Sequence, residues 1–538
     1  TSRKEIAMSA SYVLKSTSIF DGVSNSPISG GVVIEKNRIK GVYAENELTP
    51  FIGKNTKVLD FDDKLIMPGF IDSHTHTGQA MDYEDETFCI DIGAAKTFSS
   101  LAKMMQDWGA KHPEAKIIFG TNYNFFNLED RHIPTLQDMD AYFPDRPALL
   151  QTWEIHSVYA NSKALAMAGI TKETPDPNNG IGKDENGELN GVINDTAAFA
   201  LQRILMRPLE EREASLVHFM NELNRYGITS VGDLFPCGPE KPYALYKAVE
   251  DKLTVRIHFY PELLSFTPQD ISYYKTNFNT PMLQFSGLKN LIDGVISVHT
   301  AWMTKPYADD PLTSGFPAVQ PEIVREKMLE ALGMGVNVRI HTIGDKAVHY
   351  VLDVYEEAEK KFGRLPRRNV MEHLEYVLDE DIPRFAQLGV VADMQGRHIT
   401  FYVDEAARIM GEERAKLAFR WRDIYDTGAV IGTGTDYPVI HFSPFPGIYA
   451  AMTRKLENGY PESGWLPEQC MTLPEMLKIC TIGSACALNR DEDLGTLEPG
   501  KLADITILDR NLFKIPTDEI LDTMPVMTMV DGNIVFQK

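Results

Sequence analysis

Hydrophobic and polar residues alternate in short runs at both ends of the chain. The runs are SYVLKSTSIFDG, GGVVIEKNRIKGVYA and TKVLDFDDKLIMPG near the start, and GTLEPGKLADITILD and MPVMTMVDGNIVFQ near the end. Alternation with a period of two, broken by Gly, Asn and Asp, is typical of strands joined by tight turns. We therefore predict a composite β-sandwich domain formed by both termini, from residues 1–64 and 481–538.

The middle of the chain, residues 65–480, carries short apolar runs separated by helical pattern such as DKAVHYVLDVYEEAEKKFG. Eight of these runs are strand-sized: Leu65–His76, Ile228–Phe235, Thr254–Tyr260, Leu288–Gly294, Val336–Thr342, Asn369–Leu374, Val390–Met394 and Ala429–Asp436. Eight strands that alternate with helices fit an α/β fold, the (β/α)8 TIM barrel.

The interval of about 77–225 is too long for one strand-to-helix connection. It contains helical pattern and the Pro-, Asn- and Gly-rich stretch TPDPNNGIGKDENGELNG. We predict an insertion after the first barrel strand. Because such loops lie on the catalytic face of a barrel, the insertion is expected to shape the substrate pocket.

Composition and charge exclude several classes of protein. The chain has 538 residues and a mean hydropathy of −0.22, with 53 Lys and Arg against 76 Asp and Glu, a formal net charge of −23. This acidity disfavours nucleic acid and anionic membrane surfaces as partners. The longest apolar runs are strand-sized, well short of the ~20 residues of a membrane span.

The five cysteines, Cys89, Cys237, Cys470, Cys480 and Cys486, form no Cys-x-x-Cys motif. Their odd number and low density predict reduced thiols, without a disulfide framework or a thiolate zinc site. The first residues, TSRKEIA, lack the apolar segment of a secretory signal, and MSASYVLKS from Met8 resembles a native start. A cytoplasmic protein is expected; a removed signal stays an alternative because the chain begins at Thr1.

Residues of metal-binding type stand at the ends of four predicted strands, and a lysine lies within a fifth. They are His74 and His76 in the first, Lys289 in the fourth, His341 in the fifth, His373 in the sixth and Asp436 in the eighth. Barrel strand ends converge on one site, and residues i and i+2 of a strand share a face, so His74 and His76 can hold one ion together. Imidazole and carboxylate ligands suit Zn²⁺, and also Mn²⁺, Fe²⁺ or Co²⁺.

Each of these residues taken alone has a simpler interpretation. A lone histidine at a strand end is more often hydrogen-bonded structure, Asp436 could form a turn, and Lys289 could be solvated. The ordered set is harder to explain in this way. Four histidines and an aspartate also exceed what one tetrahedral catalytic zinc needs, which leaves both one and two metal ions open.

Several segments together resemble a known family. LIMPGFIDSHTH, YGITSVGD, LKNLIDG, RIHTIGDKAV, NVMEHLEY, GTGTDYPV and LGTLEPGKLADITILD are similar to motifs of the amidohydrolase superfamily. The similarity is closest to amidohydrolase family 3, which includes YtcJ-like proteins and N-substituted formamide deformylases. The insertion segments EIHSVYANSKALAMAGIT and ENGELNGVI match the same branch, and the resemblance spans about residues 12–536.

The resemblance implies a role for each residue. His74 and His76 match ligands of the more buried metal, Asp436 matches a ligand that also takes a proton from the attacking water, and His341 and His373 match ligands of a second metal. Lys289 matches a lysine that is usually carbamylated and bridges two metals; a carbamate is an anionic oxygen donor, whereas an ammonium group cannot ligate a cation. The implied cofactors are one or two divalent ions, most often zinc.

The implied reaction is hydrolysis of an amide-type C–N bond, in an N-acyl or N-formyl small molecule, by metal-activated hydroxide with Asp436 as general base and then acid. Related mononuclear deaminases often have Glu where this chain has Gly344, which favours amide hydrolysis over deamination. Ester, lactone or ring C–N hydrolysis, deamination, and a non-catalytic scaffold remain the alternatives. No G-x-S-x-G elbow or phosphate-binding loop occurs.

Substrate contacts are less defined by the sequence. His156 could reach the pocket or cap the insertion, Trp302 could wall the pocket or only pack, and Tyr437 neighbours Asp436. Arg397 could pair with a substrate carboxylate, or form a surface salt bridge. Gln395 and His398 follow the seventh strand, in a loop where Gly396 replaces the proline of many relatives. The family also implies a homo-oligomer, for which the sequence carries no interface signature.

Overall fold

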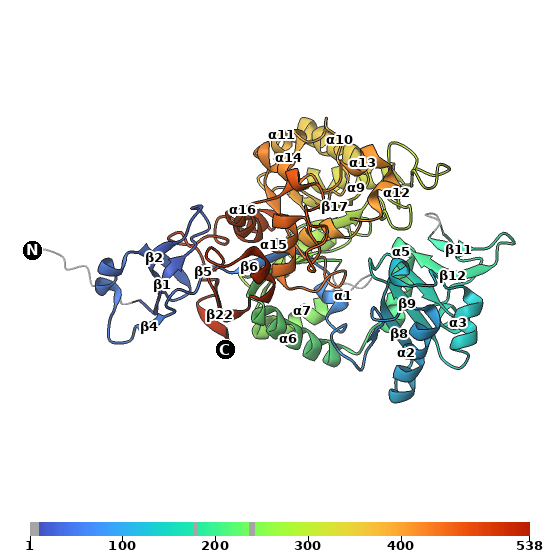
Figure 1. Cartoon of the computed structure of the whole chain (residues 1–538), viewed down its shortest axis with the longest axis horizontal. Coiled ribbons are helices and arrows are strands. Elements are labelled where there is room, and N and C mark those ends of the chain that lie inside the picture. The colour runs from blue at the N-terminus through green and yellow to red at the C-terminus, as the bar shows by residue number, and fades with distance from the viewer. Residues whose placement is uncertain (1–9, 177–179, 236–242) are drawn as a thin grey trace, which may run out of the picture.

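The computed structural model of the protein describes residues 10–176, 180–235 and 243–538. Met8, Cys237 and part of the Pro-, Asn- and Gly-rich stretch lie outside these residues. Three groups of strands follow one another across the molecule in Figure 1: a sheet made by both chain ends, a central α/β part, and the insertion. Among the described helices, none pairs the apolar character of a membrane span with sufficient length.

The chain ends form one eight-stranded sheet with the order β23-β22-β21-β5-β1-β2-β3, in which β4 also pairs with β1. Its strands are β1 Tyr12–Ile19, β2 Ile28–Glu35, β3 Arg38–Tyr43, β4 Lys57–Asp60, β5 Ile66–Pro68, β21 Ile505–Leu508, β22 Pro525–Val530 and β23 Asn533–Gln537. Side chains from both ends share one buried apolar cluster, including Leu14, Val32, Ile505 and Met527. The composite origin of this sheet therefore agrees with the sequence.

The central part contains two parallel sheets, of order β15-β14-β13-β6 and β16-β17-β18-β19-β20. Their strands are β6 Phe70–Thr75, β13 Ile228–Leu234, β14 Arg256–Tyr260, β15 Leu283–Phe285, β16 Leu288–Leu291, β17 Val338–Thr342, β18 Val370–His373, β19 Val391–Asp393 and β20 Ile431–Gly432. All eight predicted strands are present, and β15 is an additional short strand beside β14.

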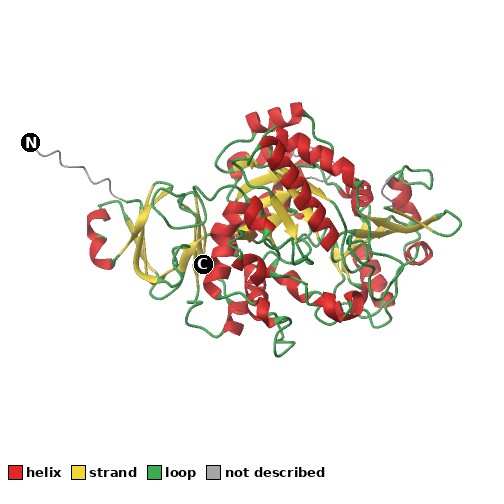
Figure 2. Ribbon diagram, turned by 90° about the horizontal axis from the view of Figure 1, so that it is seen from above, coloured by secondary structure: helices red, strands yellow, loops and turns green. Residues whose placement is uncertain are grey.

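Backbone hydrogen bonds join the two parallel sheets at two places. After β14, Pro261 O accepts from Lys289 N of β16 at 2.9 Å; after β20, the Asp436 N–H donates to His74 O of β6 at 2.7 Å. The strands consequently follow one another in a ring of hydrogen bonds. Figure 2 shows strands at the centre of this part with helices around them.

The helices beside these strands bury one apolar face each. In α10, Val348, Val351, Leu352 and Tyr355 are buried, the spacing expected of an amphipathic helix. The helices are α1 Thr77–Ala80, α6 Leu209–Arg225, α7 Tyr243–Val249, α8 Pro268–Asn277, α9 Pro321–Gly333, α10 Asp345–Phe362, α11 Arg384–Leu388, α12 Ala406–Met410, α13 Glu412–Ala415, α14 Trp421–Asp426, α15 Pro444–Thr453, α16 Leu473–Lys478 and α17 Ser484–Ala487.

The predicted strand Leu65–His76 is divided in the structure. Its first part, β5, belongs to the composite sheet, and its second part, β6, pairs with β13. Gly69 separates them, and a Cβ there would lie 2.3 Å from Thr229 Cγ2. The division follows from this close packing, which the apolar pattern does not reveal.

The insertion folds around a six-stranded sheet of order β11-β12-β10-β9-β8-β7, at the right of Figure 1. Its elements are β7 Ile90–Asp91, α2 Phe98–Lys111, β8 Ile118–Tyr123, α3 Leu136–Tyr142, β9 Ala148–Thr152, β10 Ser157–Ala160, α4 Ser162–Met167, β11 Ile181–Lys183, β12 Leu189–Asn194 and α5 Asp195–Leu205. The sequence predicted the helices but not this sheet. Two buried apolar clusters, one including Met105 and Leu150 and the other Leu149 and Ile193, give the insertion its own core.

A buried ion-pair group links the ring to the composite sheet. Arg256 at the start of β14 is fully buried, and its guanidinium donates to both carboxylate oxygens of Asp504 at 2.7 and 2.8 Å and to Asp531 at 3.0 Å. Replacing Asp504 by asparagine is expected to lower the free energy of unfolding by roughly 3 kcal/mol, because a buried guanidinium loses its main counter-charge. Urea unfolding followed by tryptophan fluorescence measures this.

A matched control is Asp107→Asn, which breaks an exposed ion pair with Lys103. Its effect should stay below about 0.5 kcal/mol, as for most surface pairs. Equal effects of the two substitutions would show that Asp504 does not stabilise the junction.

Candidate metal centre

The six residues expected from the sequence line one pocket at the strand ends. His74, His76, Lys289, His341, His373 and Asp436 share this pocket with Gln79, Ile155, His156, Phe235 and Leu291. β6, β16, β17 and β18 supply His74, Lys289, His341 and His373, while His76 directly follows β6 and Asp436 follows β20. The parallel arrangement of the strands brings residues separated by up to 362 positions to one place because all the strands end on the same side.

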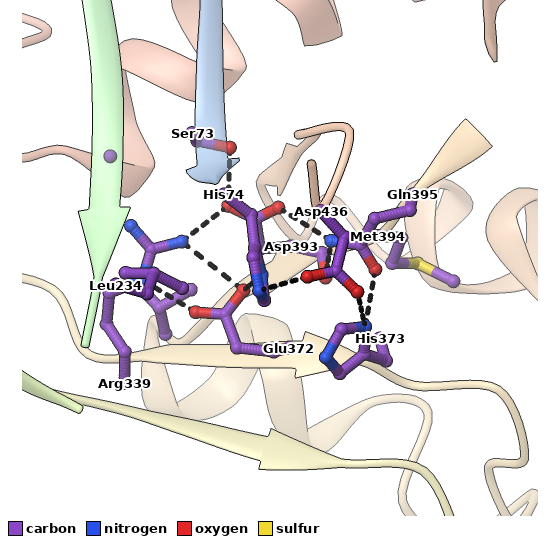
Figure 3. Close-up of polar contacts among 12 residues, drawn as sticks. Ser73, His74, Leu234, Arg339, Glu372, His373, Asp393, Met394, Gln395 and Asp436 are labelled. Atoms are coloured by element: carbon purple, nitrogen blue, oxygen red, sulfur yellow. Dashed lines mark hydrogen bonds and ion pairs between the residues drawn. The ribbon is translucent and has the colours of Figure 1, made fainter. Parts of the chain in front are cut away.

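Asp436 lies between the imidazole groups of His74 and His373 (Figure 3). Its Oδ1 is 3.1 Å from His74 Nε2 and 3.2 Å from His76 Nε2, while Oδ2 is 4.0 Å from His373 Nδ1. One ligand atom each from His74, His373 and Asp436 lies within 4.8 Å of the others, a spacing that could hold a metal ion. Burial would raise the pKa of Asp436, but the neighbouring His74 and His76 hold it well below its ordinary value.

One nitrogen of each imidazole donates to an acceptor on the surrounding chain. His74 Nδ1–H donates to Glu372 Oε2 at 2.7 Å, His76 Nδ1–H to Leu234 O at 2.9 Å, and His373 Nδ1–H to Gln395 Oε1 at 2.8 Å. His341 donates through Nε2 to Gly294 O at 3.1 Å. Such contacts fix the tautomer and the ring orientation of metal-binding histidines. Burial holds the pKa of His341 and His373 well below the ordinary value, so both rings are neutral.

Glu372 belongs to a buried charged network that the sequence analysis missed. Arg339 donates to Glu372 Oε1 at 2.6 Å and to Asp393 Oδ2 at 2.8 Å, and the Ser73 hydroxyl donates to the same Asp393 oxygen at 2.5 Å. Burial would raise the pKa of Glu372, but Arg339 and His74 hold it well below its ordinary value. The network keeps a negative charge beside His74 (Figure 3).

A signal for this network is present in the sequence. Arg339, Glu372 and Asp393 each interrupt an otherwise apolar predicted strand, in VRIHT, VMEH and VAD. Charged side chains are almost never fully buried unless they are paired. Three such residues on neighbouring strands therefore predict a buried ion-pair network.

Lys289 stands out among the six residues because its amine has no hydrogen-bond partner. The side chain is buried, and Nζ makes no hydrogen bond to any described residue. Burial lowers the pKa of Lys289 to about 8. Burial of an amine without a hydrogen-bond partner costs free energy. Such a group in a folded protein calls for an explanation, for example a catalytic role or a bound ion.

The residues considered for substrate binding lie in different surroundings. His156, at the tip between β9 and β10 of the insertion, lines the pocket with its ring 5.1 Å from that of His341. The Trp302 ring packs against Tyr350 at 5.9 Å and is not among the described residues that line the pocket. Arg397 forms an ion pair with Glu457 at 2.8 Å.

Tyr437 faces the insertion and not the metal ligands. Its hydroxyl donates to Ala80 O at 3.2 Å and to Glu84 Oε1 at 3.1 Å, and its ring stacks on Phe219. Together with Arg397 it lines a second, larger cavity between the insertion and the ring. His398 is buried with its Nε2 3.8 Å from Asp436 Oδ2.

Comparisons with known proteins agree with this geometry. A family model described as "Amidohydrolase family" matches residues 57–536. The chain is 27% identical to the putative amidohydrolase YtcJ of Bacillus subtilis over 523 residues, which cover 94% of this chain and 96% of the relative. It is 26% identical to the N-substituted formamide deformylase of Arthrobacter pascens over 535 residues, covering 94% and 95%.

A solved structure also resembles this chain over almost its whole length. An uncharacterised metal-dependent hydrolase from Pyrococcus horikoshii superposes with a TM-score of 0.72 at 25% identity, covering 94% of this chain and 99% of that one. The match extends over the composite sheet, the central part and the insertion, so the whole arrangement recurs in that protein.

Proposed function

The chain belongs to the amidohydrolase family and is a metal-dependent hydrolase acting on C–N bonds; we propose that the bond it cleaves is the amide-type bond of an N-acyl or N-formyl small molecule. The observation that carries this proposal is the convergence of four histidines, Asp436 and the unpaired amine of Lys289 on one pocket. The name of the Arthrobacter pascens relative supports an N-formyl substrate. Gly344 supports an amide over a deaminase substrate, since its N–H donates to Asp293 and it offers no side-chain acid.

The donor set fits one or two divalent metal ions. The neutral imidazoles of His341 and His373 and the ionised carboxylate of Asp436 match the ligands that zinc takes in catalytic sites. We propose zinc held by His74, His76 and Asp436, and a second ion held by His341 and His373, with Lys289 as the bridge after carbamylation. A bound metal ion would supply a water of lowered pKa and polarise the substrate carbonyl. The unpaired Nζ of Lys289 supports the bridge, because addition of CO2 to a free amine creates a carboxylate and releases one proton.

The side chains around the pocket have separate tasks in this proposal. Asp436 takes the proton from the attacking water and gives it to the leaving nitrogen, as its central place among the ligands allows. Glu372 and Gln395 keep His74 and His373 in the required tautomers. His156 extends from the insertion over the pocket and contacts the substrate, with Tyr437 and Arg397 further out.

The architecture that supports this site is part of the same proposal. We propose that the ring of strands is a closed (β/α)8 barrel and that the composite sheet folds into a β-sandwich beside it. We also propose the domain boundaries expected from the sequence with two changes: β5 goes to the composite domain, with whose strands it pairs, and α17 goes to the barrel, because it packs against β6, β19 and β20.

Metal analysis combined with an activity assay tests the proposed function. Purified protein is analysed for metal, stripped with a chelator, reconstituted with zinc, and assayed on a panel of N-acyl and N-formyl amines. We expect close to two ions per chain and activity that disappears on chelation and returns with metal. A reconstituted protein that binds no metal would overturn the ligand assignment, and a metal-loaded protein that is active only on esters or ring amidines would overturn the choice of bond.

A further inference from the structure

The pocket around the metal ligands is too small for more than the scissile group. Its volume is about 50 Å³, whereas the cavity between the insertion and the ring has about 950 Å³. One water needs about 10–15 Å³ on such a measure, and sites for whole small molecules have about 300–1,000 Å³. The larger cavity, here called the outer chamber, is therefore the space that can hold the rest of a substrate.

Ile155 connects the two spaces. It lines both the metal pocket and the outer chamber, at the tip between β9 and β10 that also carries His156. Its backbone has φ 59°, in the left-handed region that β-branched residues rarely adopt. Strain of this kind persists where the surrounding structure requires it, often at a binding site.

The lining of the outer chamber is aromatic and net acidic. Its aromatic side chains include Tyr83, Trp108, Trp153, Phe401 and Tyr437. Trp153 and Phe401 pack edge to face with their ring centroids 4.4 Å apart, one from the insertion and one from the loop after β19. Four carboxylates, of Glu84, Glu86, Asp91 and Glu405, and two cations, of Lys111 and Arg397, line it. Of the carboxylates, Glu405 is paired with Arg408 at 2.7 Å.

The two cations do little to attract an anion. Arg397 is already paired with Glu457, which lies outside the chamber lining, at 2.8 Å. Lys111, in the last turn of α2, shares the chamber with Glu84 and Glu86. A carboxylate placed here would meet more negative than positive charge, while an amine would be attracted.

We propose that the outer chamber binds the larger, non-reacting part of the substrate, that this part is aromatic and neutral or cationic, and that Ile155 sets the specificity for it. The inference rests on the proposed amide hydrolysis and specifies its substrate class. Trp153 and Phe401 form the apolar floor, and Ile155 packs against the substrate where it passes from the chamber to the metal pocket. Binding energy from the larger part then positions the scissile bond.

A matched substrate series tests this proposal on the metal-loaded protein. The series contains the N-formyl derivatives of methylamine, of an arylalkylamine, and of that arylalkylamine carrying either a carboxylate or a second amine. We expect kcat/KM to be at least about tenfold higher for the arylalkyl than for the methyl compound, and about tenfold higher for the ammonium than for the carboxylate compound.

Variants locate the effect within the chamber. Ile155→Ala and Trp153→Leu are each expected to lower the arylalkyl-to-methyl ratio of kcat/KM by about tenfold with unchanged metal content. Ile155→Gly should lower the ratio in the same way and raise the thermal midpoint, since glycine adopts this backbone conformation without strain. The control Ile133→Ala changes an exposed isoleucine of the same insertion and should leave the ratio as it is.

The outcomes separate this inference from the proposed function. A ratio near one in the unchanged protein, or a ratio that neither Ile155→Ala nor Trp153→Leu alters, overturns the role of the chamber while amide hydrolysis stands. Calorimetric titration with the free arylalkylamine tests whether the chamber binds the amine independently of hydrolysis. If no acyl amine is hydrolysed, but the amine binds and Trp153→Leu abolishes its binding, the proposed reaction fails and the chamber assignment stands.

Discussion

Replacement of Asp436 by asparagine is expected to lower kcat by about 10³- to 10⁴-fold. Asparagine keeps the size of the side chain but removes the negative charge that lies 3.1 Å from His74 Nε2 and 3.2 Å from His76 Nε2. It also removes the base that receives the proton of the attacking water. Steady-state kinetics on the best N-acyl substrate, with metal content measured on the same sample, gives the result.

The comparison with metal content decides what the loss of activity means. A variant that has lost both metal and activity would show Asp436 mainly as a ligand, and one that keeps its metal would show it as the proton carrier. Asp381→Asn is a matched control, because Asp381 is fully buried but pairs with His349 and Arg384 away from the pocket. An Asp436→Asn protein that retains both metal and most of its activity would contradict the proposed mechanism.

The positions of the candidate site residues could be predicted from the sequence because they depend on local pattern. An apolar run that ends in a polar residue marks a strand end, and parallel strands end on the same side of a sheet. His341 at the end of VRIHT and His373 at the end of VMEH were placed in this way, and the structure brings both to the pocket of His74. This prediction needed no measured distances, because strands that run parallel in one sheet bring their ends close together.

The insertion could not be predicted to the same depth. Its strands have two to six residues, such as β7 Ile90–Asp91 and β10 Ser157–Ala160, too few for a clear alternation. Their pairing joins distant segments, for instance Ile90 beside Gly120 in parallel register. The place of Ile155 between two cavities depends on how this sheet packs against the loops after β19 and β20, which no local pattern encodes.

The choice of partner for a buried charge is likewise a three-dimensional property. Arg256 reads in the sequence as one charged residue in a strand, and its partner Asp504 is 248 positions away. Sequence pattern can state that such a residue needs a partner, but only the packing of the composite sheet on the ring identifies it.

Replacement of Lys289 by alanine is expected to lower the bound metal from about two ions to about one per chain and kcat by about 10²- to 10³-fold. The Nζ atom is buried and has no hydrogen-bond partner among the described residues, so its loss breaks no hydrogen bond of the fold. It does remove the atom that would carry the carbamate. Elemental analysis, kinetics and incorporation of ¹³C-labelled bicarbonate into the unchanged protein measure the three consequences.

Two further substitutions separate a carbamate from a plain amine. Lys289→Glu restores a carboxylate near the same place and should recover part of the second metal, whereas Lys289→Arg keeps a positive charge and should recover none. Short carboxylic acids added to the Lys289→Ala protein should raise its activity, because they can enter the space that the side chain vacates. Full metal content and activity in the Lys289→Arg protein would rule out the carbamate bridge, since a guanidinium group neither reacts in this way nor ligates a cation.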